Sequence, residues 1–177
     1  MKKVSLILMI TLFISSGVAL GQRVDLDVPY VPTRQTVVNA MLKLANVQQS
    51  DVLFDLGCGD GRIVVTAAKN FGTKGTGVDL DPVRIKEAKE NAKAAEVTEL
   101  VNFMEGDLFD IDFSKATVLT LYLLPSVNLK LRPKILKEMK PGSRIVSHDF
   151  DMGDWKPDQE LQVDGSTIYL WTVPERK

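Results

Sequence analysis

The sequence predicts an α/β fold, in which helices cover both faces of a mostly parallel, twisted sheet. Apolar runs of strand length alternate along the chain with segments whose apolar residues recur at helical spacing, which is typical of such sheets. One run, residues 117–124, is apolar nearly throughout, as expected of a strand covered on both faces. Glycines at positions 57, 59 and 61 form a turn between a strand and a helix, where parallel sheets bind ligands.

The first half of the chain supplies strands and helices in alternation. Residues 22–33 contain two prolines and are expected to be extended, and residues 34–46 carry apolar side chains at helical spacing. Asp81 is a suitable N-cap and Pro82 a suitable first residue for a later helix. The strands predicted in this half are 51–56, 74–80 and 101–104, and the helices are 34–46, 61–70 and 82–95.

The second half continues the alternation and ends in a strand of a different kind. Residues 125–139 are mostly helical in pattern, and Pro133 is expected to interrupt or restart this helix because proline donates no backbone hydrogen bond. Residues 144–148 are predicted to form the fifth parallel strand. The alternation of residues 167–173 predicts a late antiparallel strand at an edge of the sheet.

Length and composition restrict the class of protein. The chain has 177 residues, a length typical of one domain, and a net charge of −1. Nucleic-acid-binding proteins usually carry a basic excess, so this balance disfavours that class. Because Cys58 is the single cysteine, neither an internal disulfide nor a cysteine-built zinc site is expected, and no metal is predicted.

The first 21 residues differ from the rest of the chain. Lys2 and Lys3 precede an apolar run that is short for a membrane span, and the small residues around Leu20 resemble the cleavage site of a secretory signal. The segment is interpreted as a signal peptide, as an uncleaved membrane anchor through residues 4–20, or as the product of a misassigned start. The expected organisation is a signal or anchor at 1–21, a pre-domain segment and helix at 22–50, and the main domain at 51–177.

The glycine turn and Asp55, which ends the strand before it, indicate the charge of the ligand. Glycines allow a sharp turn and a close approach, and the free N–H groups of the following helix suit a carboxylate or a phosphate. The carboxylate of Asp55 instead suits a cation, such as an ammonium or a sulfonium, and repels a phosphate. The turn therefore favours a ligand with a zwitterionic end.

Two further acidic residues follow the next two strands. Asp79 closes the second strand, where an acid accepts both hydroxyls of a ribose. Asp107, preceded by Gly106, follows the third strand, where an acid would accept from the amino group of an adenine. Ribose, adenine and zwitterionic end together predict S-adenosylmethionine. The alternative is a dinucleotide, whose fingerprint G-x-G-x-x-G differs from the G-x-G-x-G found here.

Four stretches resemble a known family: PYVPT (29–33), DLGCGDGRIV (55–64), LYLLPSVNLKLRPKI (121–135) and RIVSHDFDMGDWKP (144–157). On them the chain resembles the class I S-adenosylmethionine-dependent methyltransferases. It is similar more narrowly to the small archaeal protein lysine methyltransferases and to the mitochondrial lysine methyltransferases that modify the ATP synthase c-subunit and the adenine nucleotide translocase. The resemblance implies a Rossmann-like fold and direct, in-line methyl transfer to a deprotonated lysine amine of a protein substrate.

The resemblance also implies roles for particular residues. The segment 29–33 would close over the cofactor. The full set expected to bind S-adenosylmethionine is Tyr30, Thr33, Asp55, Gly57, Gly59, Asp79, Leu80, Gly106, Asp107 and Leu108. The stretch LYLLPS stands where other families carry an Asn/Asp-Pro-Pro-aromatic motif for amino groups on bases. Its absence disfavours nucleic acid as a substrate.

Three residues are candidates for the catalytic centre. Tyr122, at the end of the fourth strand, and Tyr30 would line a channel for the lysine side chain, because aromatic faces favour methylammonium groups. His148, at the end of the fifth strand, is the third candidate, as a general base. A strong base is not required, because partial burial and a nearby sulfonium both lower the pKa of an amine.

Function and location keep alternatives open at this point. A small-molecule methyltransferase and an exported, non-catalytic ligand-binding module are the other hypotheses for function. A signal peptide would export the domain, whereas S-adenosylmethionine is made in the cytoplasm. The protein is therefore expected to be exported to the periplasm or anchored in a membrane, with its oligomeric state open.

Overall fold

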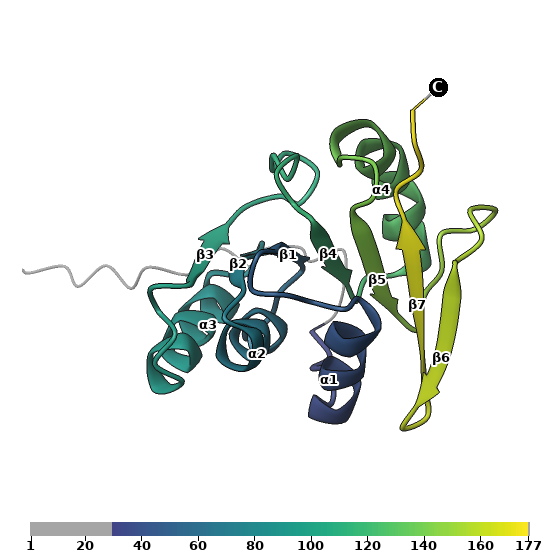
Figure 1. The fold of residues 1–177 in the computed structure, drawn as a ribbon. Coiled ribbons are helices and arrows are strands. Elements are labelled where there is room, and N and C mark those ends of the chain that lie inside the picture. The colour runs from purple at the N-terminus through teal and green to yellow at the C-terminus, as the bar shows by residue number, and fades with distance from the viewer. Residues whose placement is uncertain (1–29, 177) are drawn as a thin grey trace, which may run out of the picture.

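A seven-stranded mixed sheet with the order β3-β2-β1-β4-β5-β7-β6 forms the centre of the computed structural model, which describes residues 30–176 (Figure 1). The strands are β1 (Val52–Leu56), β2 (Lys74–Asp79), β3 (Val101–Glu105), β4 (Val118–Leu121), β5 (Arg144–His148), β6 (Gln159–Val163) and β7 (Ser166–Thr172). The helices are α1 (Gln35–Leu44), α2 (Arg62–Phe71), α3 (Pro82–Ala94) and α4 (Pro125–Glu138). The predicted α/β fold is confirmed.

The strand order reverses beside β1. From β1 the sheet grows through β2 to β3, and on the other side of β1 it continues with β4 and β5, all of them parallel. Asp55 on β1 lies opposite Gly77 of β2 and Thr120 of β4. In an open parallel sheet such a reversal leaves a crevice at the carboxyl ends of the strands, and ligands bind there.

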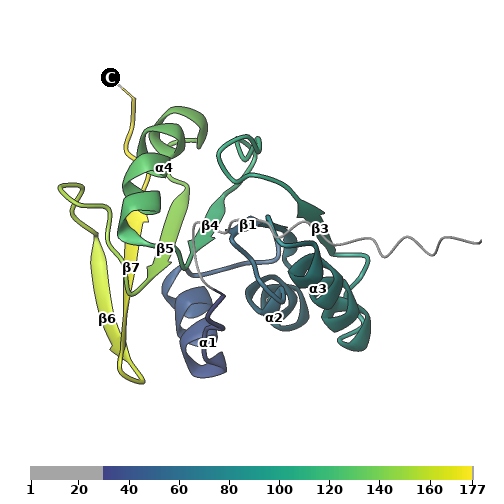
Figure 2. The same ribbon diagram turned by 180° about the vertical axis from the view of Figure 1, so that it is seen from behind.

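Helices cover both faces of the sheet (Figures 1 and 2). α1, α2 and α3 pack on one face, where they share a core with Leu53, Val118 and Val146. α4 covers the other face together with the segment between β3 and β4, which contributes the fully buried Phe113. All four residues of β4 are buried, as expected of an apolar strand that has two covered faces.

The late antiparallel element is a hairpin of two strands. β7 pairs antiparallel with both β5 and β6, so β6 and not β7 forms the edge. The sequence pattern did not reveal β6, because its residues, QELQV, are mostly polar and four of the five are exposed. Asp164 and Gly165 join the two strands with φ angles of 54° and 83°, which suit a two-residue hairpin turn.

α4 is a single helix, which corrects the interruption expected at Pro133. Proline removes one N–H group from the helical ladder and crowds the preceding turn. Leu131 and Ile135, on either side of it, are fully buried. This packing of α4 on the sheet stabilises the helix enough to retain proline within it.

The fourth strand is shorter than the sequence predicted. It ends at Leu121, because Leu124 is the N-cap of α4 and Pro125 is its first residue. Tyr122 and Leu123 therefore lie beyond the strand, at the carboxyl edge of the sheet.

The signal peptide or membrane anchor predicted at residues 1–21 lies outside the described residues. Between residues 30 and 176, no helix has the length and apolar character needed to cross a membrane. The domain boundary at residues 50 and 51 stays a prediction, and α1 packs into the same core as α2.

Candidate active site

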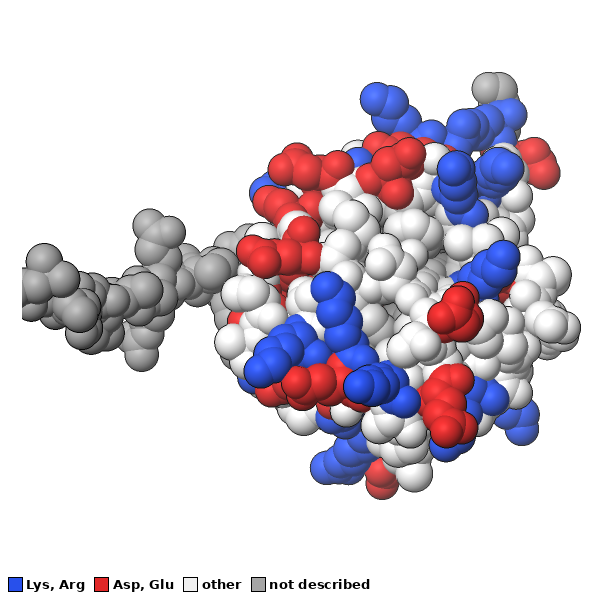
Figure 3. All heavy atoms as spheres, turned by 90° about the vertical axis from the view of Figure 1, so that its left-hand side faces the viewer, with Lys and Arg blue, Asp and Glu red and all other residues white. Residues whose placement is uncertain are grey.

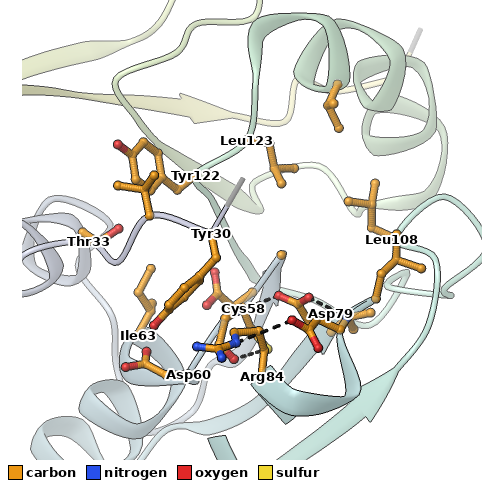
Figure 4. Close-up of a pocket in the computed structure, with 18 of the residues that line it drawn as sticks. Tyr30, Thr33, Cys58, Asp60, Ile63, Asp79, Arg84, Leu108, Tyr122 and Leu123 are labelled. Carbon is orange, nitrogen blue, oxygen red and sulfur yellow. Dashed lines mark hydrogen bonds and ion pairs between the residues drawn. The ribbon is translucent and has the colours of Figure 1, made fainter. Parts of the chain in front are cut away.

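A pocket lies where the strand order reverses, at the carboxyl ends of β1, β2 and β4 (Figure 4). Every residue that the sequence predicted for cofactor binding lines it: Tyr30, Thr33, Asp55, Gly57, Gly59, Asp79, Leu80, Gly106, Asp107 and Leu108. Tyr122 lines the pocket at the end where Thr33 lies, whereas Leu108 and Asp79 lie at the opposite end (Figure 4). The fold thus brings together residues that the sequence places at separate strand ends.

The turn after β1 requires glycine for reasons of both conformation and space. Gly57 and Gly59 have φ angles of 77° and 53°, in the left-handed region that side chains disfavour. A Cβ atom on Gly59 would lie 2.5 Å from the ring of Tyr30, and one on Gly57 would lie 2.7 Å from Leu123. The absence of side chains therefore allows Tyr30 to pack directly on the turn.

Asp79, at the end of β2, is oriented by two backbone N–H groups. Gly59 donates to its Oδ2 atom at 2.8 Å, and Asp81 donates to its Oδ1 atom at 3.0 Å. Each carboxylate oxygen can accept a further hydrogen bond. The side chain is therefore fixed in a position where it can accept from the two hydroxyls of a ribose.

Asp55 is a buried carboxyl group at the floor of the pocket. It is 2% exposed and accepts a hydrogen bond of 2.7 Å from the hydroxyl of Thr120. Burial raises its pKa to about 7, and the nearby carboxylates of Asp79 and Asp60 add to this effect while the Thr120 hydrogen bond opposes it. A cationic ligand group would relieve this concentration of negative charge.

The segment that contains Tyr30 and Thr33 is held against the glycine turn by two arginines. Arg62 donates a hydrogen bond of 2.7 Å to the backbone carbonyl of Thr33 and pairs with Asp60 at 2.6 Å. Burial opposes ionisation of Asp60, but the hydrogen bonds and charge of Arg62 hold its pKa below the ordinary value. The guanidinium of Arg84 lies 4.5 Å from the centroid of the Tyr30 ring, a cation–π contact.

Aromatic rings form the end of the pocket beside Thr33. Tyr122 and Phe150 both line it, with ring centroids 6.2 Å apart and planes inclined by 20°. Burial, reinforced by the charge of Asp149, raises the pKa of Tyr122, so the phenol stays protonated at neutral pH. His148 packs against the ring of Tyr122 at 3.8 Å between centroids and is not among the residues that line the pocket. The structure does not bring this candidate base to the pocket.

Several residues of the site were not predicted, among them Arg62, Phe150 and Thr120. Arg62 follows the glycine turn directly, Phe150 follows β5, and Thr120 lies within β4. Arg62 and Phe150 fall inside two of the stretches singled out in the sequence, so their positions carried a signal. Thr120 is the one polar residue in an apolar strand, and the register of β4 against β1 places it beside Asp55.

The site has the groups that a charged nucleoside with an amino-acid tail requires. Asp55 can face an ammonium, Asp79 can hold a ribose, and the residues after β3 can surround an adenine. These groups stand at three successive strand ends of a β3-β2-β1-β4-β5-β7-β6 sheet. This fold and this site define a class I S-adenosylmethionine-dependent methyltransferase.

The chain belongs to the family of the ANTKMT methyltransferase domain, whose model matches residues 55–159. It is 47% identical over 155 residues to a protein-lysine N-methyltransferase of Saccharolobus islandicus (strain REY15A), an alignment that covers 85% of this chain and 96% of the relative. It is 31% identical over 132 residues to the adenine nucleotide translocase lysine N-methyltransferase of Mus musculus, over 75% of this chain and 57% of that protein.

A solved structure is also similar to the chain. It is described as an RNA methyltransferase from Salinibacter ruber in complex with S-adenosyl-L-homocysteine, with 55% sequence identity and a TM-score of 0.82. The similarity covers 83% of this chain and 96% of that structure. The predicted family, enzyme class and cofactor are confirmed by these comparisons.

Proposed function

We propose that this protein transfers methyl groups from S-adenosylmethionine to lysine side chains of a protein substrate. The observation that carries the proposal is the 47% identity to a protein-lysine N-methyltransferase, of which the chain covers 96%. The pocket supports it, because Tyr122 and Phe150 present aromatic faces that suit an alkylammonium. A small-molecule substrate and a non-catalytic role have no comparable support.

The chain contributes mainly by positioning the two reactants. S-adenosylmethionine supplies, when bound, a methyl group on a positively charged sulfonium. Asp55 and Asp79 would hold its ammonium and its ribose, and these two contacts would orient the cofactor in the pocket. Tyr122 and Phe150 would desolvate the lysine as it enters the pocket. Desolvation lowers the pKa of its ammonium, so the amine can lose its proton to solvent during entry.

RNA is the second candidate substrate, because the Salinibacter ruber structure is described as an RNA methyltransferase. Two observations favour protein. Tyr122 is followed by Leu123, Leu124 and Pro125, none of which offers a side-chain acceptor for the amino group of a base. The chain has a net charge of −1 and the face shown in Figure 3 carries charges of both signs, whereas RNA-binding proteins usually carry a basic excess.

The experiment that separates these substrates uses the purified chain, S-adenosylmethionine with a labelled methyl group, and extract of the source cell. The labelled product is treated with a protease or with a ribonuclease. We expect the label to become soluble only with the protease, and a label released only by the ribonuclease would refute the proposal. Asp79→Ala is expected to abolish labelling, whereas Asp112→Asn, a substitution of an exposed acid that does not line the pocket, is the matched control.

Membrane association through residues 4–20 is a separate part of the proposal. It is supported by the apolar run that follows Lys2 and Lys3. The test compares carbonate extraction of membranes that contain the full chain or a chain beginning at residue 22. Retention of the full chain alone would support an anchor, and release of both chains would exclude it.

A further inference from the structure

His148 lies at the junction of three parts of the molecule. Its Nδ1 atom is 3.1 Å from the hydroxyl of Thr33, which lines the pocket, and its Nε2 atom is 2.9 Å from the hydroxyl of Ser166, at the start of β7. Its ring packs against Tyr122 at 3.8 Å between centroids. One imidazole therefore contacts the N-terminal segment, the terminal hairpin and the aromatic end of the pocket.

This environment does not suit a general base. His148 is 4% exposed, and both of its ring nitrogens already have hydroxyl partners. Tyr122 lines the pocket and His148 does not, so a proton leaving a lysine in the pocket would have no direct contact with the imidazole. Burial lowers the pKa of His148, although Asp149, with Oδ2 at 3.3 Å from Nε2, opposes this shift.

The partners of His148 are themselves held in place. Asp149 has a φ of 61°, and its backbone N–H donates to the carbonyl of Thr167 at 2.7 Å while its carboxylate accepts from the Thr167 N–H at 2.9 Å. Thr33 is 4% exposed, and its carbonyl is bound by Arg62. The neighbours of the imidazole on both sides are thus fixed by hydrogen bonds of their own.

We propose that His148 is a positioning residue that links the two ends of the reaction. Through Thr33 it holds the segment that lines the cofactor pocket, and through its ring it supports Tyr122 at the acceptor end. Loss of His148 would therefore disturb both the segment that contains Thr33 and the position of Tyr122. The acceptor half of this inference rests on the proposed lysine methylation, whereas the cofactor half concerns binding alone.

The test measures binding of S-adenosylhomocysteine by calorimetry, which requires no protein substrate and stays informative if the acceptor is not lysine. Thr33→Val removes the hydroxyl with little change of shape, and His148→Phe keeps a ring against Tyr122 but removes both hydrogen bonds. Each removes the Thr33–His148 contact and is expected to weaken binding by about three- to tenfold, the usual effect of one lost hydrogen bond. The double variant should be no weaker than the worse single variant, because both remove the same contact.

Two controls separate this contact from general damage. Thr33→Ser retains the hydroxyl, and its affinity for S-adenosylhomocysteine is expected to lie within about twofold of that of the unchanged chain. Thr36→Val removes a nearby hydroxyl with a different partner, since Thr36 donates to Asp164 in the hairpin turn at 2.8 Å. Binding by this variant should be unchanged. If His148→Phe fails to fold, the Thr33 variants still test the contact with His148 in place.

Turnover distinguishes positioning from proton transfer. His148→Phe should raise KM for the cofactor but keep kcat, measured at saturating S-adenosylmethionine, within about tenfold of the unchanged chain. Loss of a general base would instead lower kcat by about 10²–10⁴. Unchanged S-adenosylhomocysteine affinity in Thr33→Val would overturn the proposal, as would additive losses in the double variant. A hundredfold loss of kcat in His148→Phe with unchanged binding would instead make His148 the base.

Discussion

Binding of the cofactor should depend on pH through Asp55. Its pKa in the ligand-free protein is raised to about 7 by burial and by neighbouring carboxylates. An ammonium placed against it favours the ionised form, so only the fraction of molecules with ionised Asp55 binds without first losing a proton. That fraction is about one half at pH 7 and about one hundredth at pH 5, so the affinity should fall about fiftyfold between them.

The sign of this effect follows from the direction of the shift. Because the pKa of Asp55 is raised, acid protonates it below pH 7 and removes the charge that holds the ligand. At pH 7 binding should release about half a proton per ligand bound. His148, whose pKa is lowered by burial, does not line the pocket, so its titration is not expected to produce this slope.

Calorimetry with S-adenosylhomocysteine at pH 5, 6 and 7 measures the effect, and buffers with different ionisation enthalpies count the protons. Asp55→Asn is the matched variant, because it keeps the shape and can still bond to Thr120 but cannot ionise. It should bind weakly and with no dependence on pH in this range. Equal affinity of the unchanged chain at pH 5 and 7, or the same slope in Asp55→Asn, would refute the reasoning.

Three further predictions follow from the same pocket. Because the pKa of Asp55 is raised on folding, the native state loses stability as pH rises from about 4 to 7. Asp55→Asn removes this titration and should raise the free energy of unfolding at pH 8, measured by denaturant titration, by up to about 4 kcal/mol. Gly59→Ala should weaken cofactor binding in calorimetry, because its Cβ would meet the ring of Tyr30 at 2.5 Å and displace this residue from the pocket. Gly165→Ala, with a φ of 83° and open space, carries only the backbone strain of about 1–2 kcal/mol and should bind normally. Tyr122→Phe should keep KM for the protein substrate within about threefold in a methylation assay, whereas Tyr122→Ala should raise it about tenfold or more, because in the proposed role the aromatic face and not the hydroxyl would contact the lysine. Equal effects of the two variants would contradict this role.

The residues of the cofactor pocket could be read from the sequence because a parallel sheet gathers the ends of its strands. Asp55, Asp79 and Asp107 each stand at or just after the end of a predicted strand, and the rule that such ends meet at one edge is sufficient to place them together. The glycines between the first strand and its helix were also informative, because their positive φ angles are required by the turn that faces the ligand.

What the sequence could not show depends on contacts between distant segments. His148 was predicted at the correct strand end, but the partners of its ring come from Thr33, Tyr122 and Ser166, which lie far from it in the chain. The strand β6 escaped prediction because an exposed edge strand has no buried face to create an apolar alternation. Pro133 was misjudged because burial of α4 outweighs the local preference of proline.

The central claim, methylation of protein lysines, is tested most directly by identifying the methylated residue. The chain is incubated with S-adenosylmethionine bearing a deuterated methyl group and with extract proteins, and the products are hydrolysed to amino acids and measured by mass spectrometry. We expect deuterated methyllysine, which disappears in Asp79→Ala. Deuterium recovered only in nucleosides, or in amino acids other than lysine, would contradict the claim.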